Sequence, residues 1–111
     1  RRLFVHEAVA DTFITKLTAA YQTVKVGDPL QPGVLVGPLI DEDAVRGFEH
    51  AVEAAKQQGG EVLAGGHRLD RPGSFVAPTL IRARPDMPIC REETFAPILY
   101  VFTFSDIDAA I

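Results

Sequence analysis

Tryptophan is absent from this 111-residue sequence, and cysteine and methionine occur once each. A single cysteine cannot form an intramolecular disulfide, so a disulfide-stapled fold is excluded and a reducing cytoplasm is the expected compartment. Lysine and arginine number 11 against 15 acidic residues, which gives a formal net charge of −4. Because no basic cluster is present, neither nucleic acid nor an anionic membrane surface is an expected partner.

Long apolar runs are also missing. No stretch is long enough to cross a bilayer, and we expect no signal peptide. The composition is that of a globular protein, with 47% hydrophobic and 23% charged residues. The chain begins directly in a predicted strand and ends inside a helical pattern. We therefore expect residues 1–111 to be a fragment of a larger enzyme, with a small independent domain as the alternative.

The first part of the chain carries a strand signal and then a helix signal. Leu3 to His6 is predicted as a short strand, and Ala8 to Val24 as a helix that Gly27 and Pro29 end. The apolar residues of this helix are predicted to share one face that packs on a sheet: Val9, Phe13, Leu17, Ala20, Tyr21 and Val24. Residues 27–40 contain three prolines and three glycines, which predicts a loop.

A second amphipathic helix is predicted to begin after Asp41, its N-cap, and to end at Gly59. Its acidic first turn complements the helix dipole better than it predicts a metal site, because further ligands lie about two turns away. Short strands are predicted at residues 61–64 and on both sides of Pro78, the latter as an edge or interrupted strand. This alternation of helices and strands predicts an α/β fold with a mostly parallel sheet and flanking helices.

The most informative segment runs from Met87 to Phe104, M-P-I-C-R-E-E-T-F-A-P-I-L-Y-V-F-T-F. Residues 98–102 are apolar without polar alternation, which predicts a strand covered on both faces. Ahead of this strand, Glu93 and Phe95 lie two residues apart in a turn that Pro97 keeps from being helical. In extended backbone their side chains point to the same side. Such a pair can hold a nucleotide, because the acid accepts hydrogen bonds from ribose hydroxyls and the aromatic face packs on a flat ring.

The string R-E-E-T-F-A-P, with M-x-I beginning four residues before its arginine, resembles the E-E-x-F-G-P motif of the NAD(P)-dependent aldehyde dehydrogenases. The resemblance covers essentially the whole chain, because further blocks fall in that family's order and spacing: R-R-L-F-V-H-E, V-G-D-P, G-P-L-I, the G-G doublets and F-V-A-P-T-L-I. Ala96 replaces the usual glycine. E-T-F-A-P-I-L-Y-V-F is most similar to the α-aminoadipic semialdehyde dehydrogenase branch of the family.

The resemblance implies that residues 1–111 are part of the catalytic domain of an enzyme that oxidises an aldehyde, such as a semialdehyde, to a carboxylate. It implies NAD or NADP as cofactor, with NAD favoured, and a homo-oligomeric full-length protein. Glu93 is implied to bind the ribose hydroxyls next to nicotinamide, and Phe95 to contact the nicotinamide region. The nucleophilic cysteine and the general-base glutamate are implied to lie upstream of Arg1. The chain alone is therefore expected to contain no catalytic residue and to be inactive.

Alternatives stay open for several residues. Cys90 is a possible nucleophile by chemistry, but we predict a small buried hydrophobic residue. Glu93 could instead be a surface acid paired with Arg91, and Phe95 a core residue. The three histidines are far apart and outside any ligand or triad motif, so no metal site is predicted. For the whole chain, the alternative function is a non-catalytic α/β module that binds another protein.

Overall fold

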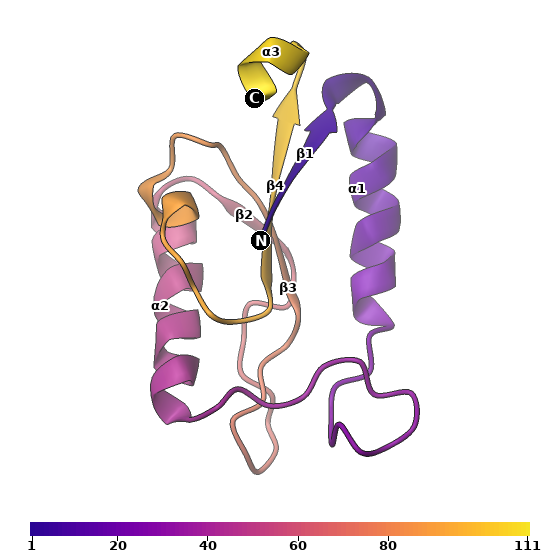
Figure 1. Cartoon of the computed structure of the whole chain (residues 1–111), viewed down its shortest axis with the longest axis vertical. Coiled ribbons are helices and arrows are strands. Elements are labelled where there is room, and N and C mark those ends of the chain that lie inside the picture. The colour runs from indigo at the N-terminus through magenta and orange to yellow at the C-terminus, as the bar shows by residue number, and fades with distance from the viewer.

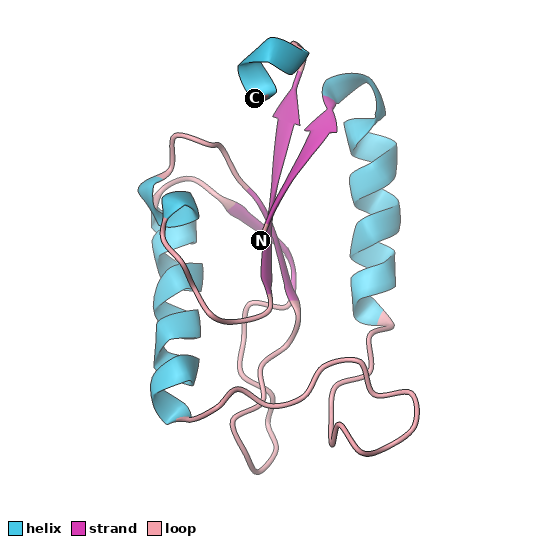
Figure 2. Ribbon diagram, in the orientation of Figure 1, coloured by secondary structure: helices cyan, strands magenta, loops and turns pink.

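The computed structural model describes all of residues 1–111 and shows a four-stranded sheet between two long helices (Figure 1). The sheet and its helices form three layers, with α1 and α2 on opposite faces and a long loop joining them around one end of the sheet (Figure 2). None of the helices is both long and apolar enough to span a bilayer. The elements in chain order are β1 (Arg2–His6), α1 (Glu7–Gln22), α2 (Glu42–Gln57), β2 (Glu61–Ala64), β3 (Thr79–Arg82), the 3-10 helix η1 (Pro88–Arg91), β4 (Ile98–Phe104) and α3 (Ile107–Ala110).

The strand order in the sheet is β1-β4-β3-β2. β4 pairs in parallel with β1 on one side and with β3 on the other, while β2 pairs antiparallel with β3 at an edge. The sheet is therefore mostly parallel, which confirms the predicted fold class. The β1 ladder begins at the start of the chain, because the Arg1 nitrogen donates to the Ile98 carbonyl at 2.9 Å and the Tyr100 N–H to the Arg1 carbonyl at 3.0 Å.

The central strand β4 is covered on both faces, as its unbroken apolar run predicted. Ile98, Tyr100 and Phe102 belong to the larger core cluster, which includes the buried face of α2. Val101 points the other way, into the smaller cluster that contains Ile14 of α1. Alternate residues of one strand thus serve two separate cores, which is why the run shows no polar alternation.

The buried face of α1 differs from the predicted one. Ala10 and Ile14 are buried, whereas Val9 and Phe13 are 56% and 42% exposed. Leu17 and Tyr21 of the predicted face do pack against the same cluster as Ala10 and Ile14, so the prediction is wrong only for Val9 and Phe13 in the first half of the helix. The helix also ends at Gln22, where Thr23 is the C-cap, two residues earlier than expected.

The start of α2 follows the prediction and adds a contact that the sequence did not indicate. Asp41 caps the helix by accepting a hydrogen bond from the Ala44 N–H at 2.8 Å. Glu42 accepts two hydrogen bonds of 2.6 Å from Arg68 and one of 3.0 Å from Ser74. These hydrogen bonds lower the pKa of Glu42 below its usual value and join the start of α2 to the loop at residues 67–74.

Of the two predictions for the strand around Pro78, the edge position is wrong, whereas the interruption at the proline is present. β3 begins at Thr79 and lies between β4 and β2, and ahead of the proline only Val76 makes an isolated bridge, to Arg68. The missing N–H of Pro78 is tolerated because it falls just before the ladder begins. Thr79 is fully buried, and its hydroxyl donates to the Ala77 carbonyl and accepts from the Gly66 N–H, both at 2.8 Å.

Candidate functional site

The segment between β3 and β4 is shaped by η1. Pro88 stands at the start of this short helix, where a backbone N–H has no intrahelical partner to lose. Its residues Ile89 and Cys90 are buried, with 3% and 5% of their surface exposed. The Ile89 N–H donates to the Gln58 side chain at 3.0 Å, which joins η1 to the end of α2. η1 thereby fixes the point from which the following residues run out towards β4.

A hollow of about 1010 Å³ opens beside this segment, at the amino ends of β1 and β4. Glu93 and Phe95, the two residues that the sequence singled out, both line it. Phe95 is 88% exposed, so the interpretation of this ring as a core residue is wrong. The other walls come from the start of β1, the loop between α1 and α2, the first turn of α2 and β4, and include Arg1, Arg2, Pro38, Leu39, Ile40, Ala44 and Tyr100.

The charged side chains of the hollow form no ion pairs with one another. All four ion pairs of the structure lie elsewhere: Arg46 with Asp43, Arg68 with Glu42, Arg82 with Asp11, and Arg84 with Asp86. Glu93 is exposed and has no ion pair with Arg91, contrary to the alternative interpretation of this residue. Its carboxylate is therefore free to accept hydrogen bonds from a ligand in the hollow.

Two buried groups also line the hollow. Burial raises the pKa of the Cys90 thiol, so this side chain is a neutral thiol and a poor nucleophile, as the prediction of a buried small residue required. Burial, with smaller contributions from Cys90 and Glu92, raises the pKa of Tyr100 to about 12. The Tyr100 hydroxyl is the one buried side-chain oxygen or nitrogen in the structure without a hydrogen-bond partner.

Sequence reasoning identified Glu93 and Phe95 and missed the rest of the hollow. Tyr100 lies in the apolar run of residues 98–102, and this run predicted only a buried strand. Arg2 lies opposite Tyr100 in the β1–β4 ladder, and that register became visible only with the sheet order. A tyrosine at an otherwise apolar core position was the available signal, since its hydroxyl needs a partner when buried.

The residues present fit the nicotinamide-ribose half of a dinucleotide. A free carboxylate and an exposed phenyl ring stand two residues apart in one hollow, the arrangement that a sugar with an attached flat ring requires. No group of three or more His, Cys, Asp or Glu side chains is placed to hold a metal ion.

Sequence comparison places these features among known proteins. The model of the aldehyde dehydrogenase family matches residues 1–111. The chain is similar to the alpha-aminoadipic semialdehyde dehydrogenase of Mus musculus, with 49% identity over 107 residues, which cover 96% of this chain and 20% of the mouse protein. It is 45% identical over 111 residues to aldehyde dehydrogenase family 7 member A1 of Pisum sativum, covering 100% of this chain and 22% of the pea protein. The chain thus spans about a fifth of the length of these relatives.

The solved structures agree with this similarity. An aldehyde dehydrogenase from Bacillus cereus superposes with a TM-score of 0.93 at 32% identity, covering 99% of this chain and 23% of the bacterial chain. The three-layer arrangement therefore belongs to an architecture already seen in much longer chains.

Proposed function

Because the chain belongs to the aldehyde dehydrogenase family, we propose that the full-length protein oxidises an aldehyde to a carboxylate with NAD or NADP as cofactor. The observation that carries this proposal for the chain's own residues is the pairing of a free Glu93 carboxylate with an exposed Phe95 ring in one hollow. Residues 1–111 contribute the nicotinamide end of the cofactor site, and the phosphates are held by other parts of the polypeptide.

Glu93 and Phe95 act by positioning. Glu93 accepts hydrogen bonds from the ribose hydroxyls, and Phe95 packs beside the nicotinamide ring. The bound cofactor supplies the hydride-accepting chemistry. Fixing the ring against the substrate carbon accounts for a large part of the barrier reduction in such reactions, so these two side chains contribute to turnover without touching the aldehyde.

The reactive thiolate has to come from outside this chain. Cys90 is the only cysteine here, and it is buried with a raised pKa. A thiol in that state is neither ionised nor accessible to an aldehyde. Residues 1–111 are accordingly inactive on their own.

The substrate that we propose is a semialdehyde, with NAD preferred over NADP. The 49% identity to a mouse protein named for alpha-aminoadipic semialdehyde supports this choice. A homo-oligomer in the cytoplasm is the state that we propose for the full-length protein.

The direct test is cofactor reduction by the complete purified polypeptide with a panel of aldehydes. The panel contrasts semialdehydes that carry a distal carboxylate with simple alkyl aldehydes of matched length, each with NAD and with NADP. We expect the highest kcat/KM for a semialdehyde with NAD. Failure of every aldehyde to reduce either cofactor would contradict the proposal and favour a non-catalytic module.

A further inference from the structure

The unpaired hydroxyl of Tyr100 is the feature of the hollow that its proposed function does not yet explain. Tyr100 is 3% exposed, and its oxygen finds no hydrogen-bond partner within the chain. A buried hydroxyl without a partner is destabilising, which is why such groups are rare. Thr79, the other deeply buried hydroxyl, shows the usual situation with one donated and one accepted hydrogen bond. The Tyr100 hydroxyl is thus free to donate a hydrogen bond that the structure does not yet contain.

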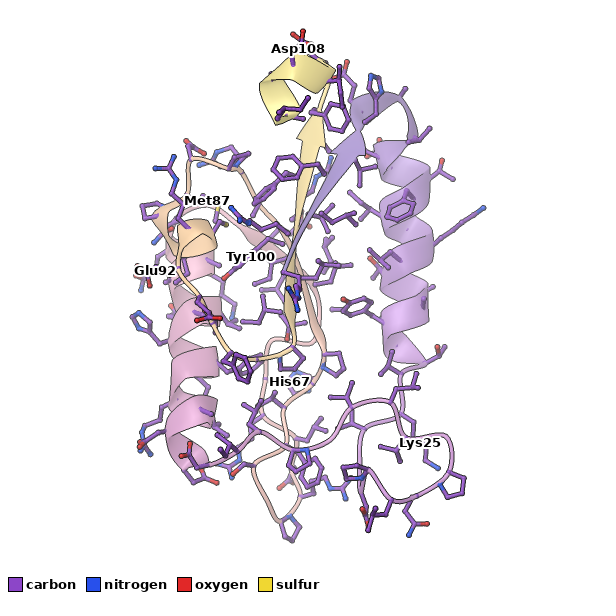
Figure 3. All side chains as sticks on the ribbon, in the orientation of Figure 1. Lys25, His67, Met87, Glu92, Tyr100 and Asp108 are labelled. Atoms are coloured by element: carbon purple, nitrogen blue, oxygen red, sulfur yellow. The ribbon has the colours of Figure 1, made fainter.

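Glu92 is a carboxylate acceptor that lines the same hollow as Tyr100. Figure 3 labels Tyr100 and Glu92 on the same side of the sheet, the side that η1 and α2 cover, and both line the hollow. The Glu92 charge is one of the influences on the Tyr100 phenol, which stays protonated and so remains a donor. Glu92 is exposed and without an ion pair, so its oxygens are free. Cys90 also lies near the phenol, but sulfur is a weak acceptor.

The segment that carries Glu92 is held loosely. Apart from Ala96, which packs against the larger core cluster, residues 91–97 are joined to the rest of the fold by backbone hydrogen bonds, from the Glu92 N–H to the Ile89 carbonyl at 3.2 Å and from the Thr79 N–H to the Pro97 carbonyl at 2.9 Å. No side-chain hydrogen bond fixes this segment, although it presents both Glu93 and Phe95. A segment of this kind loses conformational freedom when a ligand binds, and that loss weakens binding unless a new contact offsets it.

We propose that Tyr100 is a positioning residue whose hydroxyl donates a hydrogen bond to the Glu92 carboxylate when the nicotinamide cofactor fills the hollow. This inference rests on the proposed function. The new hydrogen bond joins the loose segment to the rigid centre of the sheet, one residue away from Glu93. It also gives the buried hydroxyl its missing partner at the moment when the segment has to be ordered.

A double-mutant cycle in the full-length protein tests the inference. The variants are Tyr100→Phe, Glu92→Ala and the double variant, with dissociation constants for NAD measured by calorimetry and melting temperatures measured without cofactor. We expect each single change to weaken NAD binding about tenfold. The double variant should bind no more weakly than either single one, because both remove the same hydrogen bond. Melting without cofactor should not fall for Tyr100→Phe, since the deleted hydroxyl had no partner.

Tyr21→Phe is the matched control, because Tyr21 is the only other tyrosine and lies on α1, across the sheet from the hollow. It should leave both NAD affinity and melting unchanged. If Tyr100 had a purely structural role, Tyr100→Phe would lower the melting temperature, and its effect on NAD affinity would not be coupled to that of Glu92→Ala.

Two outcomes overturn the inference while leaving the proposed function intact: unchanged NAD affinity in Tyr100→Phe, and additive losses in the double variant. Coupling of Tyr100→Phe to Cys90→Ala instead of Glu92→Ala would assign the hydroxyl to the thiol and likewise overturn it. If the wild-type protein neither binds nor reduces NAD or NADP, the proposed function fails first and the inference falls with it.

Discussion

Glu93 has no ion pair within the chain, although Arg1, Arg2 and Arg91 line the same hollow. An exposed ion pair contributes little to stability, so nothing in the fold itself demands an acid at this position. A free carboxylate beside an exposed phenyl ring is what the proposed contact with the cofactor requires.

Replacing Glu93 by Gln tests the proposed contact between the Glu93 carboxylate and the cofactor. The amide keeps the size of the side chain but loses the charge that strengthens hydrogen bonds from the ribose hydroxyls. We expect a roughly tenfold rise in KM for NAD or a comparable fall in turnover of the full-length enzyme, measured by steady-state kinetics.

Glu49→Gln is the control for this change, because Glu49 is an exposed acid on α2 outside the hollow. It should leave both constants unchanged. Wild-type kinetics in the Glu93→Gln variant would mean that this acid does not touch the cofactor.

The Cys90 thiol should resist alkylation. Its pKa is raised by burial, so the protonated form persists to higher pH than for a free cysteine, and the thiolate is the reactive form. With iodoacetamide at mildly alkaline pH, peptide mass spectrometry should find Cys90 unmodified in the folded full-length protein and modified after denaturation. Rapid alkylation of Cys90 in the folded protein would instead identify an accessible thiolate and reopen its candidacy as the nucleophile.

At this scale, local spacing was enough to place Glu93 and Phe95 together, because two residues of extended chain bring their side chains to one side, and both line the hollow. Their role towards a cofactor stays a prediction. The unpaired hydroxyl of Tyr100 could not be predicted, because it depends on which side chains from α2 and η1 close around it. Satisfaction of a buried polar group is a property of the packed interior rather than of a motif.

Gly65 and Gly47 differ in how strongly the surrounding structure requires a glycine. Gly65 follows β2 with φ of +68°, and a Cβ there would lie 2.3 Å from the Pro78 carbonyl oxygen. Gly47 lies inside α2, with nothing within 4 Å of a Cβ. One position requires glycine for both conformation and space, and the other only loses helix stability by having it.

The two alanine substitutions are therefore expected to change the free energy of unfolding in opposite directions. Gly65→Ala should lower the free energy of unfolding by more than about 1 kcal/mol, because the strained turn cannot make room at the start of β3. Gly47→Ala should raise it by about 0.5–1 kcal/mol through reduced backbone freedom in the unfolded state. Chemical denaturation of the two variants beside wild type measures both, and equal effects would show that the turn after β2 is not constrained as described.

The elements themselves were predictable where one strong local signal acted alone. Asp41 caps α2 as expected, and the apolar stripe of α2 is buried. The face of α1 was not predictable, since Val9 and Phe13 compete with Ala10 and Ile14 for the sheet and only tertiary packing decides between them. The interruption at Pro78 was predictable, but the interior position of β3 was not, because a proline just before an interior strand looks the same in sequence as a proline on an edge strand.

At the scale of the whole molecule, the hollow is assembled from segments that are far apart in sequence. Arg2 and Tyr100 are neighbours because β1 and β4 pair in parallel, and residues 38–40 reach the same place through the loop ahead of α2. No local pattern encodes such pairing, so the sequence predicted the parallel sheet as a class but not its order. The family resemblance gave the expectation of a cofactor site at Glu93 and Phe95. The parallel pairing of β1 with β4 shows which other residues line the hollow beside them.

The chain by itself should not oxidise aldehydes. Its one cysteine is buried, so no thiolate is available to attack a carbonyl, whatever the affinity of the hollow for nicotinamide. Purified residues 1–111, shown to be folded by circular dichroism, should produce no reduced cofactor under conditions in which the full-length protein turns over. Turnover by the folded chain alone would show that a nucleophile has been overlooked within it.

A crystal structure of the full-length protein with bound NAD would show directly whether Glu93 and Phe95 face the nicotinamide half of the cofactor. We expect a Glu93 carboxylate oxygen within hydrogen-bonding distance of a hydroxyl of the nicotinamide ribose, and the Phe95 ring in contact with the nicotinamide region. A nicotinamide ribose bound elsewhere, with Glu93 still in solvent, would exclude this role for both residues.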